Sequence, residues 1–327
     1  MLRNIFLKKS GLLSMVNAVC LLAILAILLG LQEIAAAGTK RQKTFETPEA
    51  TVTALVKAVQ ASNPKYLMRL LGPGSKAIVI SGDNVQDRQN RTQFLRAYKE
   101  KNRLEPGADG AVRLFIGKDD WPFPFPIVKD GKYWRFDAQA GKEEVLNRRI
   151  GKNELNAMQV CLAIADAQRD YSEMMADMKG RPEYAQKFES VQGQKEKDGL
   201  FWETAPNDKQ SPLGPLISRA RAEGYDDSVN RAVPYHGYLY NILSIQGESA
   251  NGGIIDYVID GKMIGGFAVV AFPALYGSSG IHTIITNHEG VIYLKDLGKD
   301  TVKTAADMKA FNPDKTWKKA DKAVLCR

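Results

Sequence analysis

Histidine and cysteine, which supply many metal ligands and catalytic groups, are scarce in this chain. Its 327 residues include three histidines and three cysteines. The cysteines are far apart and form no C-x-x-C pair, which excludes a disulfide framework, so the fold must rest on hydrophobic cores. Cys161 lies on the apolar face of a predicted helix, and we expect it not to be bonded to Cys326, although oxidising surroundings would favour that bond.

The motifs of several large enzyme classes are also missing. No serine stands in a G-x-S-x-G elbow, and the sequence has no Walker loop and no dinucleotide-binding fingerprint. His282 and His288 flank a predicted turn and lack the tight same-face spacing of zinc ligands. We therefore expect no metal site and no cofactor.

Charged residues are absent from residues 10–32, which are largely apolar. Three basic residues precede this stretch, and three alanines at 35–37 follow it. A basic start, an apolar stretch and small residues form the secretory signal pattern. We expect residues 1–37 to be a cleaved signal peptide and the protein to be periplasmic or otherwise extracytoplasmic. The alternative is an uncleaved anchor in the inner membrane, because the uncharged run is long enough to span a bilayer.

The remaining chain has no long block of charge of one sign. Removing residues 1–37 takes away three basic residues and one acid, which lowers the formal charge from +8 to +6 over 290 residues. Basic and acidic residues alternate along the chain, as in Lys195-Glu196-Lys197. Such mixing is typical of a solvated surface and argues against a nucleic-acid partner.

The first half of the chain predicts a small α+β domain over residues 47–145, after a polar linker at residues 38–46. Thr47-Pro48 and Asn63-Pro64 each combine an N-cap residue with proline at the first helical position. Residues 127–136 read as a hairpin in which Asp130-Gly131 supplies both positive φ angles of a type I′ turn. The order of these elements is similar to the nuclear-transport-factor-2-like cone fold.

The second half, residues 146–327, predicts another α+β domain. It opens with a long helix expected at residues 153–177 and ends in an antiparallel meander from residue 235 onward, with Asp260-Gly261 as one of its turns. A helix followed by a meander faintly resembles the globular part of pilin-like proteins. We expect the two domains to join between residues 140 and 155, where Arg148 and Arg149 suit an interdomain salt bridge or an anion site.

Several unusual phrases of the chain resemble a known family. They are Asp119-Asp120-Trp121-Pro122-Phe123-Pro124, Asn147-Arg148-Arg149-Ile150-Gly151, Pro234-Tyr235-His236-Gly237-Tyr238 and Gly290-Val291-Ile292-Tyr293. These phrases resemble the bacterial family called domain of unknown function 2950, and the resemblance covers nearly all of the chain after residue 37. It implies an exported protein of Gram-negative type. The family has no established activity, so the resemblance transfers no catalytic residue.

The first candidate ligand site is the proline-rich loop that begins with Asp119 and Asp120. Paired carboxylates beside Trp121 and Phe123 suit contact with a glycan. The prolines exclude a central strand, so this segment must be an edge or a rim loop. The same aromatic residues would equally serve to cap the core of the first domain.

The second candidate site is the tyrosine-rich segment around His236. His236 between Tyr235 and Tyr238 suits binding of a sugar or general-base chemistry. The alternative is an ordinary strand with His236 on the face opposite the tyrosines. Neither candidate site contains a nucleophile motif.

We therefore expect an exported envelope protein that binds or scaffolds without catalysis, with an envelope component or another protein as its partner. A hydrolase acting on envelope glycan or peptide, and a structural subunit of a pilus-like assembly, remain alternatives. An acid/base pair that meets at one reacting atom would favour the hydrolase.

Overall fold

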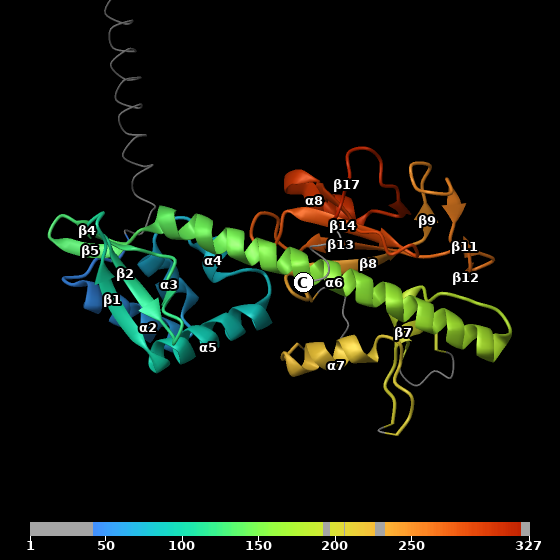
Figure 1. Ribbon diagram of the computed structural model, residues 1–327, viewed down its shortest axis with the longest axis horizontal. Coiled ribbons are helices and arrows are strands. Elements are labelled where there is room, and N and C mark those ends of the chain that lie inside the picture. Colours follow the sequence, from blue (N-terminus) through green and yellow to red (C-terminus); the bar gives the residue numbers. More distant parts are fainter. Residues whose placement is uncertain (1–41, 192–196, 206, 226–232, 322–327) are drawn as a thin grey trace, which may run out of the picture. The chain divides into compact units, whose positions relative to one another are not determined.

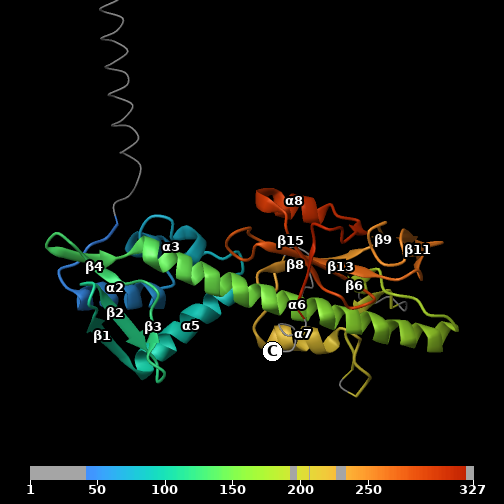
Figure 2. The same ribbon diagram turned by 45° about the horizontal axis from the view of Figure 1, so that its top comes forward.

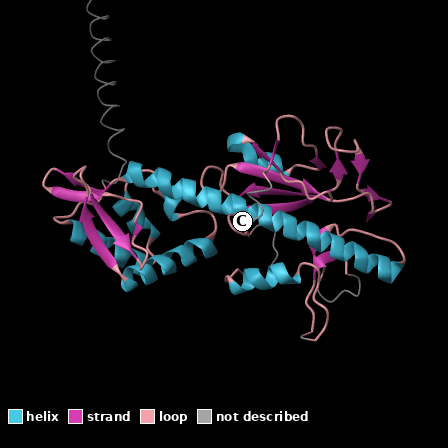
Figure 3. Cartoon of the chain, viewed as in Figure 1, coloured by secondary structure: helices cyan, strands magenta, loops and turns pink. Residues whose placement is uncertain are grey.

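The computed structural model describes residues 42–191, 197–205, 207–225 and 233–321. From Thr44 on, the chain forms one compact unit. The α+β class is confirmed, because 38% of the described residues are in helices and 24% in strands. Figure 3 shows how these helices and strands are distributed. Among the described residues, no helix combines the length and the apolar character needed to cross a membrane.

The first hydrophobic cluster, called the first core here, is formed by helices on an antiparallel sheet. The sheet has the strand order β1-β2-β4-β5, and a short strand β3 also pairs with β2. Its core includes Leu55, Leu70, Ile127 and Phe136, all of which are buried. The elements are α2 (Pro48–Gln60), α3 (Pro64–Leu71), α4 (Lys76–Val79), α5 (Asn84–Glu100), β1 (Asn102–Pro106), β2 (Val112–Ile116), β3 (Trp121–Pro122), β4 (Ile127–Asp130) and β5 (Tyr133–Phe136).

The predicted helix starts at Thr47 and Asn63 are confirmed by their hydrogen bonds. The Thr47 hydroxyl accepts from the backbone N–H of Ala50 at 3.1 Å. The Asn63 side chain accepts from the N–H of Tyr66 at 3.0 Å. Each cap satisfies one of the N–H groups that a helix leaves unbonded at its start, which is why both starts were readable from sequence.

The predicted hairpin at residues 127–136 is present, but its turn lies one residue further along. Asp130 pairs with Tyr133, so Gly131 and Lys132 are the central residues. Gly131 has φ 63°, whereas Asp130 has no positive φ. Glycine at the first central position is typical of a type II′ turn, so the expected type I′ turn was wrong here. Asp260-Gly261, with φ values of 51° and 73°, does form the tight turn that was expected.

A second cluster, called the second core, surrounds a sheet with the strand order β17-β15-β14-β13-β8. All four pairings in this sheet are antiparallel. Its strands are β8 (Tyr238–Leu243), β13 (Ala268–Pro273), β14 (His282–Asn287), β15 (Tyr293–Asp296) and β17 (Lys318–Lys319). Smaller pieces complete this half: β6 (Lys187–Glu189), β7 (Gly199–Phe201), α7 (Gly214–Ala222), β9 (Ile245–Gln246), β10 (Ile255–Asp256), β11 (Val258–Ile259), β12 (Lys262–Met263), η1 (Gly298–Asp300), α8 (Thr301–Ala306) and β16 (Ala310–Phe311).

One continuous helix, α6 (Ala138–Lys179), contributes to both cores (Figures 1 and 2). It begins fifteen residues before the expected start at residue 153 and runs through the segment in which we expected two domains to join. Its first part lacks an apolar stripe and contains two glycines, which is why periodicity did not reveal it. The helix starts because the Asp137 carboxylate caps the N–H groups of Gln139 and Ala140.

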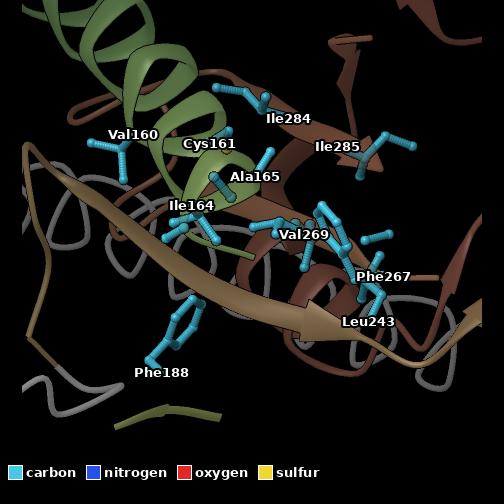
Figure 4. Close-up of a cluster of buried hydrophobic side chains, with 14 of the residues drawn as sticks. Val160, Cys161, Ile164, Ala165, Phe188, Leu243, Phe267, Val269, Ile284 and Ile285 are labelled. Atoms are coloured by element: carbon cyan, nitrogen blue, oxygen red, sulfur yellow. The ribbon is translucent and has the colours of Figure 1, made fainter. Parts of the chain in front are cut away.

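The middle of α6 packs against the sheet of the second core. Figure 4 shows Cys161, Ile164 and Ala165 facing Val269 and Ile284. Cys161 is fully buried, and burial raises the pKa of its thiol well above the usual range. Cys326 lies outside the described residues, so the absence of a bond between the two cysteines stays a prediction.

Two glycines of α6 give a matched test of its packing. A Cβ at Gly141 would stand 2.2 Å from the ring of the buried Phe125, whereas a Cβ at Gly151 would meet nothing within 4 Å. We expect Gly141→Ala to lower the free energy of unfolding by about 1–3 kcal/mol through overpacking. Gly151→Ala should raise it by up to about 1 kcal/mol through helix propensity. Urea denaturation measures both, and equal effects of the two changes would contradict this packing.

Candidate functional site

The carboxylate of Asp120, predicted as a ligand contact, is held by two cations. Lys101 Nζ donates to it at 2.8 Å and Arg103 Nε at 3.0 Å. Hydrogen bonds from Lys101 and then Arg103 lower the pKa of Asp120 below its ordinary value. Asp119 beside it is exposed. The Asp120 side chain therefore fixes its own loop to β1 and the end of α5.

The aromatic residues of the same loop divide between the surface and the first core. Trp121 is 40% exposed, and the Arg148 guanidinium lies 5.5 Å from its ring centroid. Phe123 instead points inward, with its ring 5.5 Å from Phe94 and 6.0 Å from Phe136. Of the two predicted aromatic contacts, Trp121 is accessible to a partner and Phe123 belongs to the core.

Tyr238, which was also predicted as a ligand contact, is fully buried in the second core. Its hydroxyl donates to the backbone oxygen of His282 at 2.9 Å. Burial raises the pKa of this hydroxyl well above its ordinary value. Tyr238 therefore packs inside the second core and is not accessible to a partner.

His236 lies in a tight turn, so the expectation of a strand with His236 opposite the tyrosines was wrong. Tyr235 and Tyr238 exchange backbone hydrogen bonds of 2.9 and 3.2 Å across the turn. His236 and Gly237 have φ values of 51° and 76°, the pattern of a type I′ turn. A positive φ is uncommon outside glycine, although histidine adopts it more often than most residues, and such conformations persist where surrounding contacts hold them.

Those contacts come from residues distant in the sequence. The N–H of Gly237 donates to Asp83 Oδ2 at 3.1 Å, and the N–H of His236 donates to the Tyr225 hydroxyl at 3.3 Å. The Tyr225 hydroxyl donates in turn to Asp83 Oδ2 at 2.7 Å. Asp83 is itself the N-cap of α5 and accepts from the N–H of Gln86. One buried carboxylate thus joins α5, Tyr225 and the His236 turn.

The His236 ring is enclosed on several sides. Its centroid lies 4.1 Å from that of Tyr235 and 6.0 Å from that of Tyr225. Its Nε2 atom lies 3.4 Å from Glu223 Oε2, just beyond an ordinary hydrogen bond. Burial lowers the pKa of His236 below its ordinary value and outweighs the opposite effects of Glu223 and Asp83. The surroundings of the ring therefore favour the neutral imidazole.

Further polar contacts extend from this cluster along α6. The Gln86 amide donates to Asn153 Oδ1 at 2.9 Å, and Asn153 Nδ2 donates to the backbone oxygen of Ser279 at 2.9 Å. Arg149 donates to the backbone oxygens of Ala77 and Ile78. Together with the Asp83 contacts, these bonds form what we call the polar interface, which lies between the two cores.

Neither alternative predicted for Arg148 and Arg149 describes this arrangement fully. Arg149 crosses the polar interface, but it bonds backbone carbonyls and not an acid of the other half. Arg148 pairs with Glu144 one turn earlier on the same helix, at 2.5 Å. These hydrogen bonds of Arg149 form only in the folded tertiary structure, because Ala77 and Ile78 lie 72 and 71 residues away in the sequence.

The other two histidines lie apart from the His236 turn. His282 Nδ1 is 3.0 Å from Glu154 Oε2, and Glu154 also accepts from the N–H groups of Ile281 and His282. His288 packs edge-on against Tyr257 and Phe267. In the part of the chain that the structure describes, no group of three or more His, Cys, Asp or Glu side chains is arranged to hold a metal ion.

Sequence reasoning missed three residues of this cluster: Asp83, Glu223 and Tyr225. Asp83 stands directly before a helix, so the sequence signals an N-cap there. Nothing local indicates its second role, because its partners Tyr225 and Gly237 are 142 and 154 residues away. Glu223 follows α7 in a stretch without any motif.

Comparison with known proteins gives a family and no function. Residues 42–320 match the family described as "Protein of unknown function (DUF2950)". No curated protein and no solved structure matches the chain. The match covers every described element, from the first helix to β17, including both halves of the polar interface. The chain therefore belongs to the DUF2950 family, as its sequence phrases had indicated.

Proposed function

We propose that this chain is an exported cell-envelope protein that binds a ligand or partner at its polar interface, next to the His236 turn, and carries out no reaction. The observation that carries the proposal is the strained turn itself. His236 is held at positive φ by Asp83 and Tyr225, and its ring lies against Glu223. Strained residues that their surroundings hold in place are concentrated at binding and catalytic sites.

The position of the turn supports binding. In the described part of the chain the two hydrophobic clusters share no buried residue, and hydrogen bonds to backbone and amide groups connect them. Interfaces of this polar kind permit relative motion more readily than hydrophobic ones. Ligand sites also occur preferentially at domain interfaces, which the boundary between the two cores resembles.

The carboxylates around the candidate sites argue against catalysis. Asp83 accepts from three donors, and Asp120 accepts from two cations. Glu154 accepts from two backbone N–H groups and contacts His282. An acid or base in catalysis must reach a reacting atom, whereas these three carboxylates are engaged in holding the fold.

One contact favours the second candidate function, a hydrolase acting on envelope glycan or peptide. Burial favours the neutral form of His236, and its ring lies beside Glu223, as a general base with an orienting carboxylate would. Release of soluble fragments from envelope glycan or peptide by the wild type, and not by His236→Asn, would support the hydrolase and contradict binding without catalysis.

Export is supported by the N-terminal pattern of basic residues, an apolar stretch and three alanines. We expect the protein recovered from its native envelope to begin at or near Gly38, because cleavage follows small residues. Intact mass analysis measures this. A chain that still begins at Met1 would show that residues 1–37 act as an anchor.

Affinity capture from an envelope extract tests where binding occurs. We expect His236→Asn to reduce the captured partner strongly, because asparagine tolerates a positive φ but lacks the ring. Trp121→Ala tests the other predicted surface. Tyr133→Ala is its matched control, because Tyr133 is an equally exposed aromatic of the same sheet. Tyr238 is unsuitable, since removing a fully buried side chain would unfold the second core.

Capture that His236→Asn leaves unchanged and Trp121→Ala abolishes would move the binding site to the Trp121 loop. If all three variants capture the same partner as the wild type, neither surface binds, and the proposed site is wrong. A circular dichroism melt of each variant confirms that it is folded.

A further inference from the structure

We propose that protonation of His236 loosens the polar interface, so that the two cores are held together at neutral pH and separate locally in mild acid. The proposal concerns the protein without a ligand. Its failure would therefore leave the binding proposal standing, and loss of binding would not by itself contradict it.

The His236 turn is where the second core contacts the N-terminal end of α5. Its two central N–H groups are bonded to the Tyr225 hydroxyl and to Asp83. Both bonds depend on positive φ angles at His236 and Gly237. Any force that moves the ring therefore acts directly on the hydrogen bonds that connect this turn to Asp83.

Among the residues that the structure describes, four charged groups act on the imidazole from the elements around it. Glu223, at the end of α7, and Asp83, at the start of α5, favour the protonated ring. Arg219 of α7 and Lys152 of α6 oppose it. The side chain is 17% exposed and packs against two tyrosine rings. Burial outweighs the two acids, so the neutral form is preferred in the folded protein.

The direction of the pH effect follows from this preference. The folded-state pKa of His236 lies below the ordinary value of 6.5. The stability that the neutral His236 gives the folded protein is therefore fully present above pH 6.5 and is lost as the pH falls through the lowered pKa. A ring that gains charge is stabilised by reaching water, and the turn must release Asp83 and Tyr225 for the ring to move there.

Four residues near the His236 turn do not respond in the same way. Gln86 and Asn153 carry no titrating group, and Arg149 stays charged. Asp87 accepts from the N–H of Ser81, and burial raises its pKa, so the folded state gains relative stability there as the pH falls. Acid loosening of this region thus depends on His236, and each core keeps its own hydrophobic packing.

Hydrogen exchange measured by mass spectrometry between pH 7.5 and 5.5 tests this pH response of the polar interface, on protein purified from its native envelope. After correction for the intrinsic exchange rate, we expect faster exchange at low pH in peptides covering residues 81–90 and 233–240. Each unit by which the His236 pKa is depressed corresponds to about a tenfold change in the opening equilibrium. Peptides from the middle of α6, around Cys161, should keep their protection.

His236→Asn should abolish the pH response, because asparagine accepts the positive φ and does not titrate. His282→Gln is the matched control and should retain the wild-type response, since His282 contacts Glu154 and not the turn. The wild type also gives a test without a variant, in which NMR titration reports the pKa of His236 directly.

A His236 pKa at or above 6.5 would overturn the proposal. A pH response that persists in His236→Asn would do so as well, and so would exchange that increases equally in both cores, because that would be global unfolding.

Discussion

The buried carboxylate of Asp83 is the interaction on which the arrangement of this protein depends. A buried charge must find hydrogen-bond donors, and Asp83 finds them in three places: the N–H of Gln86, the hydroxyl of Tyr225 and the N–H of Gly237. The first donor starts α5, and the other two belong to the second half of the chain. Removing any of them would leave part of a buried charge unpaired, which is strongly unfavourable. The same carboxylate that begins a helix therefore also fixes the His236 turn.

Helix α6 supplies the second constraint, because one rigid element belongs to both cores. Its first turn places Gly141 against Phe125, and its middle places Cys161 and Ile164 in the second core. Between them, Arg149 and Asn153 bond to groups on both sides of the polar interface. The cores are thus connected by a continuous backbone and by polar contacts, without a shared hydrophobic cluster. Our two proposals, ligand binding and a response to protonation, both rest on this combination of a continuous helix and polar contacts.

The same contacts explain why the groups that first suggest chemistry argue for binding. Asp120 is paired with Lys101 and Arg103, and Tyr238 is buried within the second sheet. What remains near a strained backbone is a neutral imidazole beside Glu223. The ring is too enclosed to be an ordinary surface histidine, and the contacts around it include no serine or cysteine nucleophile among the described residues. The recognition role that we propose, with its protonation-dependent interface, rests on this strained turn and its enclosed ring.

The sequence by itself determined the local structure. It predicted the α+β class, the helix caps at Thr47 and Asn63 and the turn at Asp260-Gly261, because each depends on neighbours within a few residues. It failed where packing overrides a local pattern: α6 extends through a polar, glycine-containing stretch, and His236 takes a turn where alternation predicted a strand. Only the tertiary structure decided that Asp83 meets Tyr225 and Gly237, and hence where the candidate site lies. Tyr225 and Gly237 lie 142 and 154 residues from Asp83 along the chain, and no local propensity or spacing encodes a contact that forms only in the folded tertiary structure.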